Sequence, residues 1–268
     1  RFAHGSSGEV DQVTFRNIVH GTVQGTAIAT NQAGNAIAPS DVNLDVTNST
    51  FENIGRIGVL FKGESVTGTF IGNTYTGKGP GTHLDYVLDI SAGAVVEVRG
   101  NTITNIHGVA ADNSVSGGIL VTDFFGPGTT ATIEDNVFED NSYGIVVGFT
   151  AADSSSLAIS DNQFLGNTVA ISSNQTTPIT LGADNVFTGN GTNLVGDFDG
   201  DLPPAQNRYV ETDGDDANFC SDPAEPCQTI QRAVNIAGDG ETIHVGEGTF
   251  VEQVIVDDKE LTIEGEGD

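Results

Sequence analysis

The sequence has no tryptophan and no methionine, and its 268 residues include only four tyrosines, two cysteines and nine lysine or arginine residues. The shortage of basic residues argues against nucleic-acid binding, because neutralising a phosphate backbone requires clustered lysine and arginine. Binding to an anionic membrane surface is disfavoured for the same reason. No apolar run is long enough to cross a bilayer, so we do not expect membrane insertion either.

Acidic residues and glycine are abundant instead. The chain carries 37 Asp and Glu residues, a formal net charge of −28 and 35 glycines. With 37% hydrophobic residues it can still bury a core, in which small and β-branched side chains replace bulky ones. This composition favours many short strands joined by tight turns. The acidic surface is typical of a protein that stays soluble at high salt.

A repeated unit runs through residues 10–196. It consists of an alternating strand, an asparagine, an aromatic or aliphatic residue two positions later, and then a second Asn or Gly. Such repetition predicts a solenoid. In the three clearest copies the first asparagine and the aromatic residue are Asn136 and Phe138, Asn162 and Phe164, and Asn185 and Phe187.

The repeat gives an alignment of successive coils. It makes the following residues equivalent: Phe15, Phe51, Tyr75, Ile103, Phe138, Phe164 and Phe187. The spacings between them are 36, 24, 28, 35, 26 and 23 residues, so one coil takes about 23 residues and the longer spacings contain loop insertions. We place these insertions at Gln32–Ser40, Lys78–Thr82, Ala110–Ser116 and Asp123–Thr129. The sequence thus predicts an all-β fold, a parallel β-helix of seven coils over residues 1–196.

The repeated asparagines and aromatic residues are predicted to be structural. Inward residues of one coil stack on those of the next at the strand spacing of roughly 4.8 Å, so the phenylalanines form an aromatic ladder. The asparagines lie at turns, where asparagine tolerates left-handed backbone geometry and its amide can bond to the asparagine of the next coil. No single coil buries its own face, so we expect stability to come from the stacking of neighbouring coils.

The sequence changes character at Asp197. From here to the last residue the chain has 19 acidic and only three basic residues. We interpret residues 197–207, which contain two consecutive prolines, as an acidic linker. Residues 208–268 form a separate module. Within it, residues 228–237 have apolar side chains at helical spacing and precede a glycine, which predicts a short amphipathic helix between strands.

The two cysteines, Cys220 and Cys227, lie seven residues apart in a loop-like segment. This spacing fits a local disulfide, with two free thiols as the alternative. A disulfide implies an oxidising compartment, so we expect an extracellular or cell-surface protein. The chain starts with Arg1 instead of methionine, in keeping with removal of a leader or an upstream region.

The module contains three motifs in order: Pro226-Cys-Gln-Thr-Ile-Gln231, Gly240-Glu-Thr-Ile-His-Val245 and Gly248-Thr-Phe250. Over residues 208–267 it resembles the N-terminal start of the pectate-lyase-like right-handed β-helix family of secreted proteins. The resemblance implies a right-handed solenoid whose first coils follow a capping helix. Glu241 departs from the family pattern, which has Asp at this position.

The opening module of that family therefore stands at the other end of this chain. Residues 1–196 resemble a β-helix body without an N-terminal cap, and residues 208–268 resemble a cap with first coils and no body. Two explanations stay open. The chain is one period of a tandem array of β-helices, or the last coils of one subunit dock onto the open first coil of the next and form a head-to-tail filament.

Many relatives with this fold cleave acidic polysaccharides, so a polysaccharide lyase or glycoside hydrolase is the alternative function. None of the polygalacturonase-type motifs Asn-Thr-Asp, Gly-His-Gly and Arg-Ile-Lys occurs. The candidates for a lateral groove are Arg99, Lys62, Asp89 and Asp123, and solvated strand or turn residues are the plainer interpretation. The net charge of −28 also repels uronate polymers. Binding of carbohydrate or of ice is a third possibility. It requires a flat, regular array of threonine or aromatic side chains, and the outward positions of this chain are mixed.

Calcium is the one metal for which the sequence offers ligands. Carboxylates alternate around glycine in two segments, at Asp197, Asp199 and Asp201 and at Asp213 and Asp215. Such oxygen-rich segments suit Ca²⁺, although neither has the full EF-hand spacing. A solvated acidic linker is the alternative. Taken together, the sequence favours a non-enzymatic structural or adhesive protein that associates with copies of itself.

Overall fold

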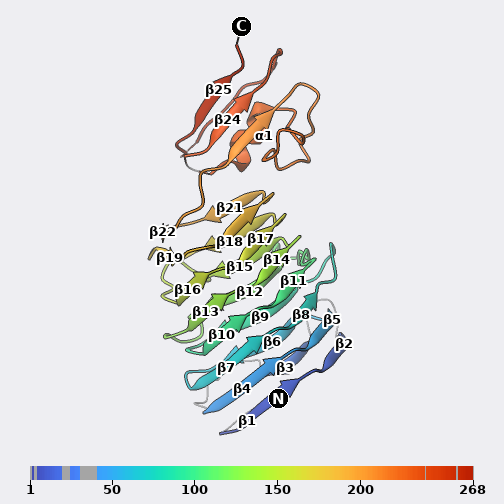
Figure 1. Cartoon of the computed structure of the whole chain (residues 1–268), viewed down its shortest axis with the longest axis vertical. Helices are drawn as coiled ribbons and strands as arrows, with labels where there is room; N and C mark the ends of the chain where they lie inside the picture. The colour runs from blue at the N-terminus through green and yellow to red at the C-terminus, as the bar shows by residue number, and fades with distance from the viewer. Residues whose placement is uncertain are drawn as a thin grey trace.

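The computed structural model describes residues 2, 5–19, 25–30, 41–238, 240–257 and 259–267. Three large parallel sheets, one small sheet and one short helix make up its regular structure (Figure 1). The predicted all-β parallel solenoid is therefore confirmed. The predicted insertion Gln32–Ser40 lies outside the described residues. No helix in the described ranges is long and apolar enough to cross a membrane.

Each coil contributes one strand to each of three sheets, which we call the first, second and third sheet. The first sheet contains β1 (Ser7–Asp11), β4 (Val42–Thr47), β7 (Val66–Ile71), β10 (Val95–Arg99), β13 (Thr130–Glu134), β16 (Ser156–Ser160), β19 (Ile179–Leu181) and β22 (Phe198–Gly200). The second sheet contains β2 (Thr14–Ile18), β5 (Thr50–Ile54), β8 (Thr74–Thr76), β11 (Thr102–Thr104), β14 (Val137–Glu139), β17 (Gln163–Leu165) and β20 (Val186–Thr188). The third sheet contains β3 (Thr26–Ala29), β6 (Ile57–Lys62), β9 (Tyr86–Ser91), β12 (Gly117–Thr122), β15 (Tyr143–Val147), β18 (Val169–Ser173) and β21 (Thr192–Val195).

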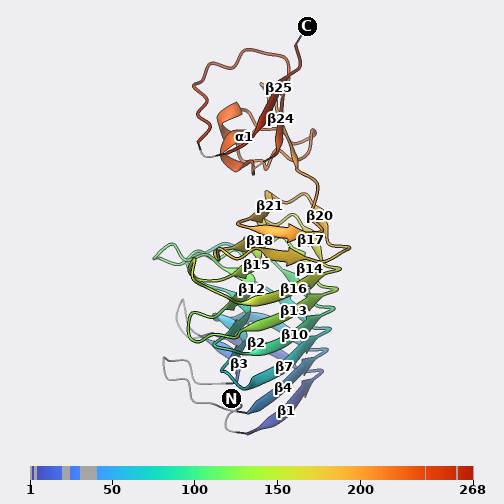
Figure 2. The ribbon, with the colours of Figure 1, turned by 90° about the vertical axis from the view of Figure 1, so that its left-hand side faces the viewer.

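The C-terminal module has a small parallel sheet of its own. It contains β23 (Asn207–Val210), β24 (Thr242–Val245) and β25 (Thr262–Gly265), together with helix α1 (Ile230–Ile236). The module lies beyond the last coil, at the end of the rod opposite to β1 (Figures 1 and 2). The segment interpreted as a linker begins with a strand, because β22 pairs with β19 and so belongs to the rod. The connection between rod and module is thus shorter than residues 197–207.

The strand register follows the alignment of coils that the sequence predicts. Each aromatic or aliphatic residue of the second sheet pairs with its predicted equivalent in the neighbouring strand, along the series Phe15, Phe51, Tyr75, Ile103, Phe138, Phe164 and Phe187. The rings of Phe138 and Phe164 are 5.0 Å apart and nearly parallel, as are those of Phe164 and Phe187. The aromatic ladder is therefore continuous over the last three coils.

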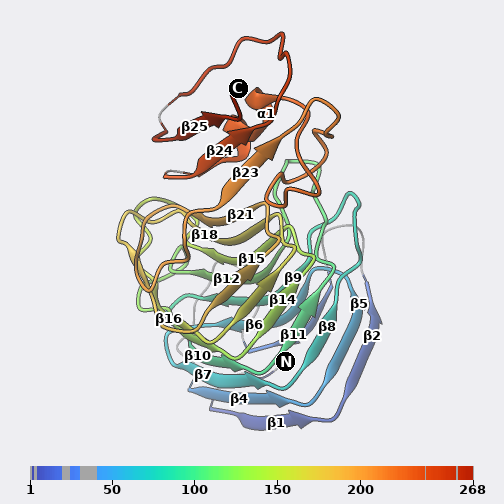
Figure 3. The same ribbon diagram turned by 45° about the horizontal axis from the view of Figure 1, so that its top comes forward.

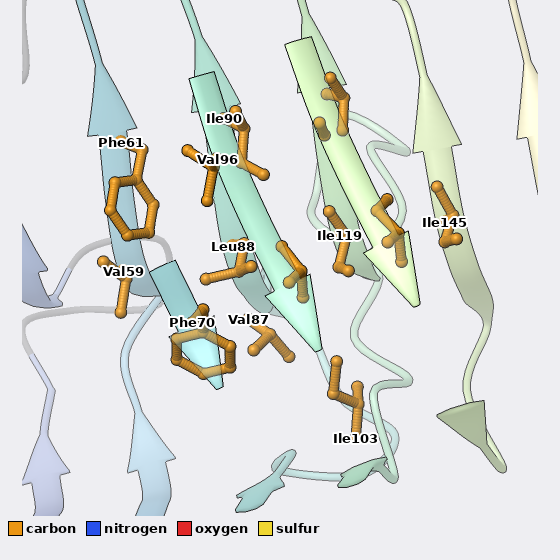
Figure 4. Close-up of a cluster of buried hydrophobic side chains, with 14 of the residues drawn as sticks. Val59, Phe61, Phe70, Val87, Leu88, Ile90, Val96, Ile103, Ile119 and Ile145 are labelled. Carbon is orange, nitrogen blue, oxygen red and sulfur yellow. The ribbon is translucent and has the colours of Figure 1, made fainter. Parts of the chain in front are cut away.

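The core fills the space between the three sheets, as Figures 3 and 4 show. Side chains from the first, second and third sheet meet there, and Phe61, Phe70 and Ile103 are completely buried. Glycines of the third sheet make room for the aromatic ladder. A Cβ atom at Gly144 would lie 3.1 Å from the Phe164 ring and 2.6 Å from the Ala170 carbonyl oxygen. Small residues of the third sheet thus pack against large side chains of the second sheet.

Buried asparagines form a hydrogen-bonded ladder at the turn between the first and second sheets. The Asn136 backbone N–H and side-chain Nδ2 both donate to Asn162 Oδ1, each at 3.0 Å. Asn162 donates in the same way to Asn185 Oδ1, at 3.1 and 3.2 Å. Each amide therefore bonds to the next coil. A second ladder of the same kind runs through Asn141, Asn167 and Asn190.

The left-handed turn geometry expected of the repeated asparagines is found at Asn17, Asn48, Asn53 and Asn105. At the asparagines of the ladder it belongs instead to the residues before them. Asp135, Asp161 and Asp184 have φ angles of 56°, 59° and 62°, and the asparagines that follow do not have positive φ. Aspartate tolerates this conformation and keeps its charge in solvent. The buried asparagine is then free to bond with its side chain. The aspartate thus supplies the left-handed turn conformation and the asparagine supplies the side-chain hydrogen bonds, whereas the sequence predicted both roles for asparagine.

We predict that Asn162→Leu destabilises the rod by about 3 kcal/mol, because it removes the acceptor of the buried Asn136 backbone N–H and a donor to the buried Ile133 carbonyl oxygen. Asp161→Asn is the matched control, since asparagine also adopts the left-handed conformation, and its effect should stay within about 0.5 kcal/mol. Urea unfolding followed by circular dichroism measures both. Equal destabilisation by the two variants would contradict a structural ladder.

Candidate functional sites

A buried ion pair lies at the centre of the C-terminal module. Arg208 of β23 is completely buried, and its Nε lies 2.7 Å from Glu241 Oε2. Its other nitrogens donate to Glu241 Oε1, to the Phe219 carbonyl oxygen and to Gln206 Oε1. Every charged group here has a partner, as burial of charge requires. The sequence showed only that Glu241 departs from a motif, and it gave no signal for Arg208.

Helix α1 is capped at both ends by side chains from distant parts of the module. Thr229 is the N-cap and accepts from the Arg232 N–H, while Glu252 accepts from the N–H groups of Ile230 and Gln231. At the other end, Lys259 Nζ donates to three carbonyl oxygens of the last turn. Negative charge at the N-terminus and positive charge at the C-terminus of a helix are both stabilising.

The disulfide between Cys220 and Cys227 is formed, with a Cα–Cα distance of 5.2 Å. Both cysteines are buried in the small core of the module. The Cys227 N–H donates to the Tyr209 carbonyl oxygen at 2.9 Å, and the Tyr209 N–H donates to the Cys220 carbonyl oxygen at 2.8 Å. The disulfide therefore fixes the cysteine loop against β23.

The junction between rod and module consists of a few direct contacts around a cleft. Thr192 of the last coil donates its hydroxyl to the Ile236 carbonyl oxygen at 3.3 Å, and Gln206 donates to the Asn190 carbonyl oxygen at 3.1 Å. The Phe219 ring lies so close to Gly191 that a Cβ there would approach it to 2.7 Å. The cleft has a volume of about 820 Å³ and is lined by both parts. The sequence did not predict that helix α1 faces the end of the rod.

The acidic residues suggested as calcium ligands all lie at the surface. Asp197, Asp199 and Asp201 are exposed at the end of the rod, whereas Asp213 and Asp215 are exposed in a loop of the module. Asp215 accepts a hydrogen bond from the Ala217 N–H at 2.9 Å. In the part of the chain that the structure describes, no three His, Cys, Asp or Glu side chains are grouped so that they could hold a metal ion. Structural calcium stays a prediction.

Three of the four candidates for a lateral groove lie along the third sheet. Lys62 ends β6, Asp89 lies in β9, and Asp123 follows β12 directly. The fourth, Arg99, ends β10 in the first sheet, where it contacts Glu97 and Glu134. The structure therefore separates Arg99 from the others. No single groove contains all four side chains.

Asp89 lies in an unusual environment for a carboxylate. Its Oδ1 atom is buried and has no hydrogen-bond partner in the described structure. Burial raises the pKa of Asp89, and the positive charges of Lys62 and Arg56 oppose this shift only in part. Burial also lowers the pKa of Lys62, whose Nζ lies 3.6 Å from the centre of the Phe125 ring.

A buried polar cluster that the sequence did not reveal lies where the second sheet turns into the third. The Tyr75 hydroxyl donates to Asp85 Oδ1 at 2.5 Å, and Lys78 Nζ lies 3.2 Å from Asp85 Oδ2. Lys78 Nζ also donates to the carbonyl oxygens of Ile54 and Gly55 in the preceding coil. Because protein acceptors surround the ammonium group, we interpret Lys78 as a cross-link between an inserted loop and its neighbouring coil.

His83 lies beside this cluster in the same inserted loop. Its Nε2 atom is buried and unpartnered in the described structure. Burial and the nearby charge of Lys78 lower the pKa of His83, with Asp85 opposing them. The folded protein therefore holds His83 neutral at a pH at which an unfolded chain would protonate it.

The comparison with protein families gave a match to the rod. A profile for the family described as "Right handed beta helix region" matches residues 2–196, which is more than half of the chain. The comparisons with curated proteins and with solved structures gave no match. The matched residues are those of the rod. The resemblance of residues 208–267 to pectate-lyase-like proteins lies outside the match and stays a prediction.

The ion pair of the module yields a stability prediction. Glu241→Gln should destabilise the module by roughly 3–5 kcal/mol, because it leaves the buried Arg208 guanidinium without its counter-charge. The double variant Arg208→Met with Glu241→Leu should be less destabilised than Glu241→Gln alone, since it buries no charge. Thermal unfolding of the wild type, Glu241→Gln and the double variant provides the test. A double variant that is the least stable of the three would contradict a charge-balancing role.

His83 yields a prediction about pH. Above about pH 7 the histidine is neutral in both states and makes no pH-dependent contribution. As the pH falls through about 6.5, the unfolded state binds a proton that the folded state excludes, so stability is lost. His83→Gln should therefore lose less stability than the wild type between about pH 7.5 and 5.5. Urea unfolding at the two pH values measures the difference, and parallel losses would contradict the prediction.

Proposed function

The chain belongs to the family of right-handed β-helix proteins, and from this premise we propose that it is a non-enzymatic structural protein whose β-helical units join end to end. The proposal rests on one observation. Helix α1 and Phe219 of the module lie against the last coil of the rod within the same chain. The chain thus contains one junction between the end of one solenoid segment and the start of another.

The need for such a junction follows from the physics of a solenoid. The last coil of a β-helix has no neighbour on one side, so its backbone groups and core side chains lack partners there. At this junction the Asn190 carbonyl oxygen accepts from Gln206, and the Thr192 hydroxyl donates to Ile236. The module therefore supplies hydrogen-bond partners to some of the polar groups of the last coil.

The module offers a similar open edge on its far side. In the described structure, β25 pairs only with β24, and all four of its residues are exposed. Ile263 of this strand is 44% exposed, and Val251 and Ile255, in the segment between β24 and β25, are 95% and 59% exposed. An edge of this kind is a template for pairing with another strand.

The first coil of the rod supplies a complementary edge. Strands β1, β2 and β3 each have a strand partner on one side only in the described residues, and Phe2 covers part of this edge by donating its N–H to the Ala29 carbonyl oxygen of β3. Rod and module both consist of parallel strands, so a further coil can continue either of them without reversing the chain direction. We propose that the β25 edge of one copy receives the first coil of a second copy, which yields a filament in which every contact is heterologous.

Charge sets the conditions under which such a contact forms. Both edges carry glutamate, Glu264 on β25 and Glu9 on β1, and the chain has a net charge of −28. Repulsion between copies is strong at low ionic strength and is screened when the Debye length falls to about 3 Å near 1 M salt. The disulfide supports an oxidising location, and we propose the exterior of the cell.

Enzymatic cleavage of a polysaccharide is less well supported. A lyase or hydrolase needs its acid and base groups in one groove. Arg99 lies on the first sheet beside two glutamates, and Asp123 accepts a hydrogen bond from the Ser154 N–H at 2.9 Å. These side chains stabilise neighbouring coils, and Lys62 and Asp89 alone do not form a complete site.

Assembly is tested with the purified chain. We expect monomers at about 0.05 M NaCl and rods that lengthen with protein concentration at about 2 M NaCl, because the added salt screens the repulsion. Gly265→Pro should abolish the rods, since proline removes a backbone N–H from the free edge of β25. Gly265→Ala keeps that N–H, has free space for its Cβ and serves as the matched control. Light scattering and electron microscopy give the readout.

Two outcomes would contradict the proposal. Short particles of the mass of one chain at both salt concentrations would exclude self-assembly. Rods that form equally well with Gly265→Pro would show that the β25 edge is not the contact. Retention of the β-helix by the proline variant, checked by circular dichroism, separates loss of assembly from loss of folding.

A further inference from the structure

Two loops beside the third sheet display aromatic rings to solvent. Phe124 and Phe125 follow β12, and Phe149 follows β15 one coil further on. The Phe124 ring lies 4.7 Å from that of Phe149 and 5.0 Å from that of Phe125, measured between centroids. Phe124 is 53% exposed and Phe149 is 65% exposed, and they are the only exposed aromatic residues in the described part of the chain. We call these three residues the phenylalanine cluster.

The two loops are held together by a pair of carboxylates. Asp153 accepts from the Thr122 hydroxyl at 2.6 Å, from the Asp123 N–H at 3.0 Å and from the Phe149 N–H at 3.3 Å. In return, Asp123 accepts from the Ser154 N–H. The loops from adjacent coils therefore bind each other. The exposed rings are consequently fixed in place before any partner arrives, which lowers the entropic cost of binding.

The rings pack against one another at steep angles and do not form a flat surface. The planes of Phe124 and Phe125 meet at 85°, and those of Phe124 and Phe149 meet at 58°. A sugar ring stacks best on a level aromatic face, whereas walls at steep angles suit a compact cation. The cluster already contacts one ammonium group, because Lys62 Nζ lies 3.6 Å from the centre of the Phe125 ring.

The charge around the cluster also favours a cation. Asp123 directly precedes Phe124 in the sequence, and Asp153 accepts from the Phe149 backbone N–H. Although burial acts in the opposite direction, hydrogen bonds from Thr122, Ser155 and backbone N–H groups hold the pKa of Asp153 below its ordinary value, so it is charged at neutral pH. The chain as a whole has 37 acidic and nine basic residues. Its field therefore attracts positively charged partners.

We propose that Phe124 and Phe149 form a docking site for a lysine side chain of a basic partner protein. The ammonium group lies over the solvent-exposed faces of the two rings, and the carboxylates at the base of the loops add electrostatic attraction. This site lies on the side of the rod, away from its two ends, so it is independent of the end-to-end assembly proposed above.

The test uses the short peptide acetyl-Gly-Lys-Gly-Lys-Gly-amide as the probe. We expect the aromatic NMR signals of Phe124 and Phe149 to shift on titration of the whole chain with this peptide, and Phe→Leu variants assign those signals. The double variant Phe124→Leu with Phe149→Leu keeps the site apolar but removes the rings, and it should bind the peptide roughly tenfold more weakly. The same peptide with both lysines acetylated should produce no shift, because acetylation removes the charge.

Controls separate the site from general attraction between opposite charges. Asp161→Asn removes one exposed acidic charge at a turn between the first and second sheets, and it should leave binding to the peptide unchanged. Equal binding by the double leucine variant and the wild type would overturn the proposal, as would equal binding of the acetylated peptide. Shifts of the two rings with cellohexaose but not with the lysine peptide would overturn it in favour of a saccharide site. A circular dichroism spectrum of the leucine variant matching that of the wild type excludes misfolding.

Discussion

The whole rod depends on the contact between each coil and its two neighbours. A coil of about 23 residues cannot bury its own inward face, so its strands must pair and its side chains must stack on the coils before and after it. The buried asparagines extend this pairing through the turns, where regular strand pairing ends. Asn136 Nδ2, for example, donates both to Asn162 in the following coil and to the Val98 carbonyl oxygen in the preceding one.

The same requirement explains the polar groups that are buried away from the ladders. Lys78 binds carbonyl oxygens of the preceding coil and ties down a loop that the repeat does not contain. In the module, Arg208 and Glu241 form a buried ion pair, and a small core of few apolar side chains surrounds them. Lys78 thus holds its loop to the preceding coil through side-chain hydrogen bonds, whereas Arg208 and Glu241 reinforce the pairing of β23 with β24.

The acidic composition and the function proposed for the chain are connected. Part of the negative charge lies at turn residues such as Asp135, Asp161 and Asp184, where aspartate also supplies the left-handed conformation. A charged surface keeps open strand edges apart at low salt. It also attracts cationic groups to the phenylalanine cluster. One feature of the composition therefore affects the turns, the assembly of the rod and the partners that its side can bind.

The sequence by itself determined the repeat and much of the register. Because side chains stack one coil apart, equivalent residues such as Phe138 and Phe164 could be paired from their spacing alone, and the structure pairs them. The order of rod and module, the short helix and the disulfide follow from local patterns in the same way. Contacts made by inserted loops were decided only by the tertiary structure. The hydrogen bond between Tyr75 and Asp85, for example, joins two residues only ten positions apart, which the spacing of one coil does not predict. A periodic pattern specifies which strands are neighbours, but the path of each inserted loop depends on the complete fold.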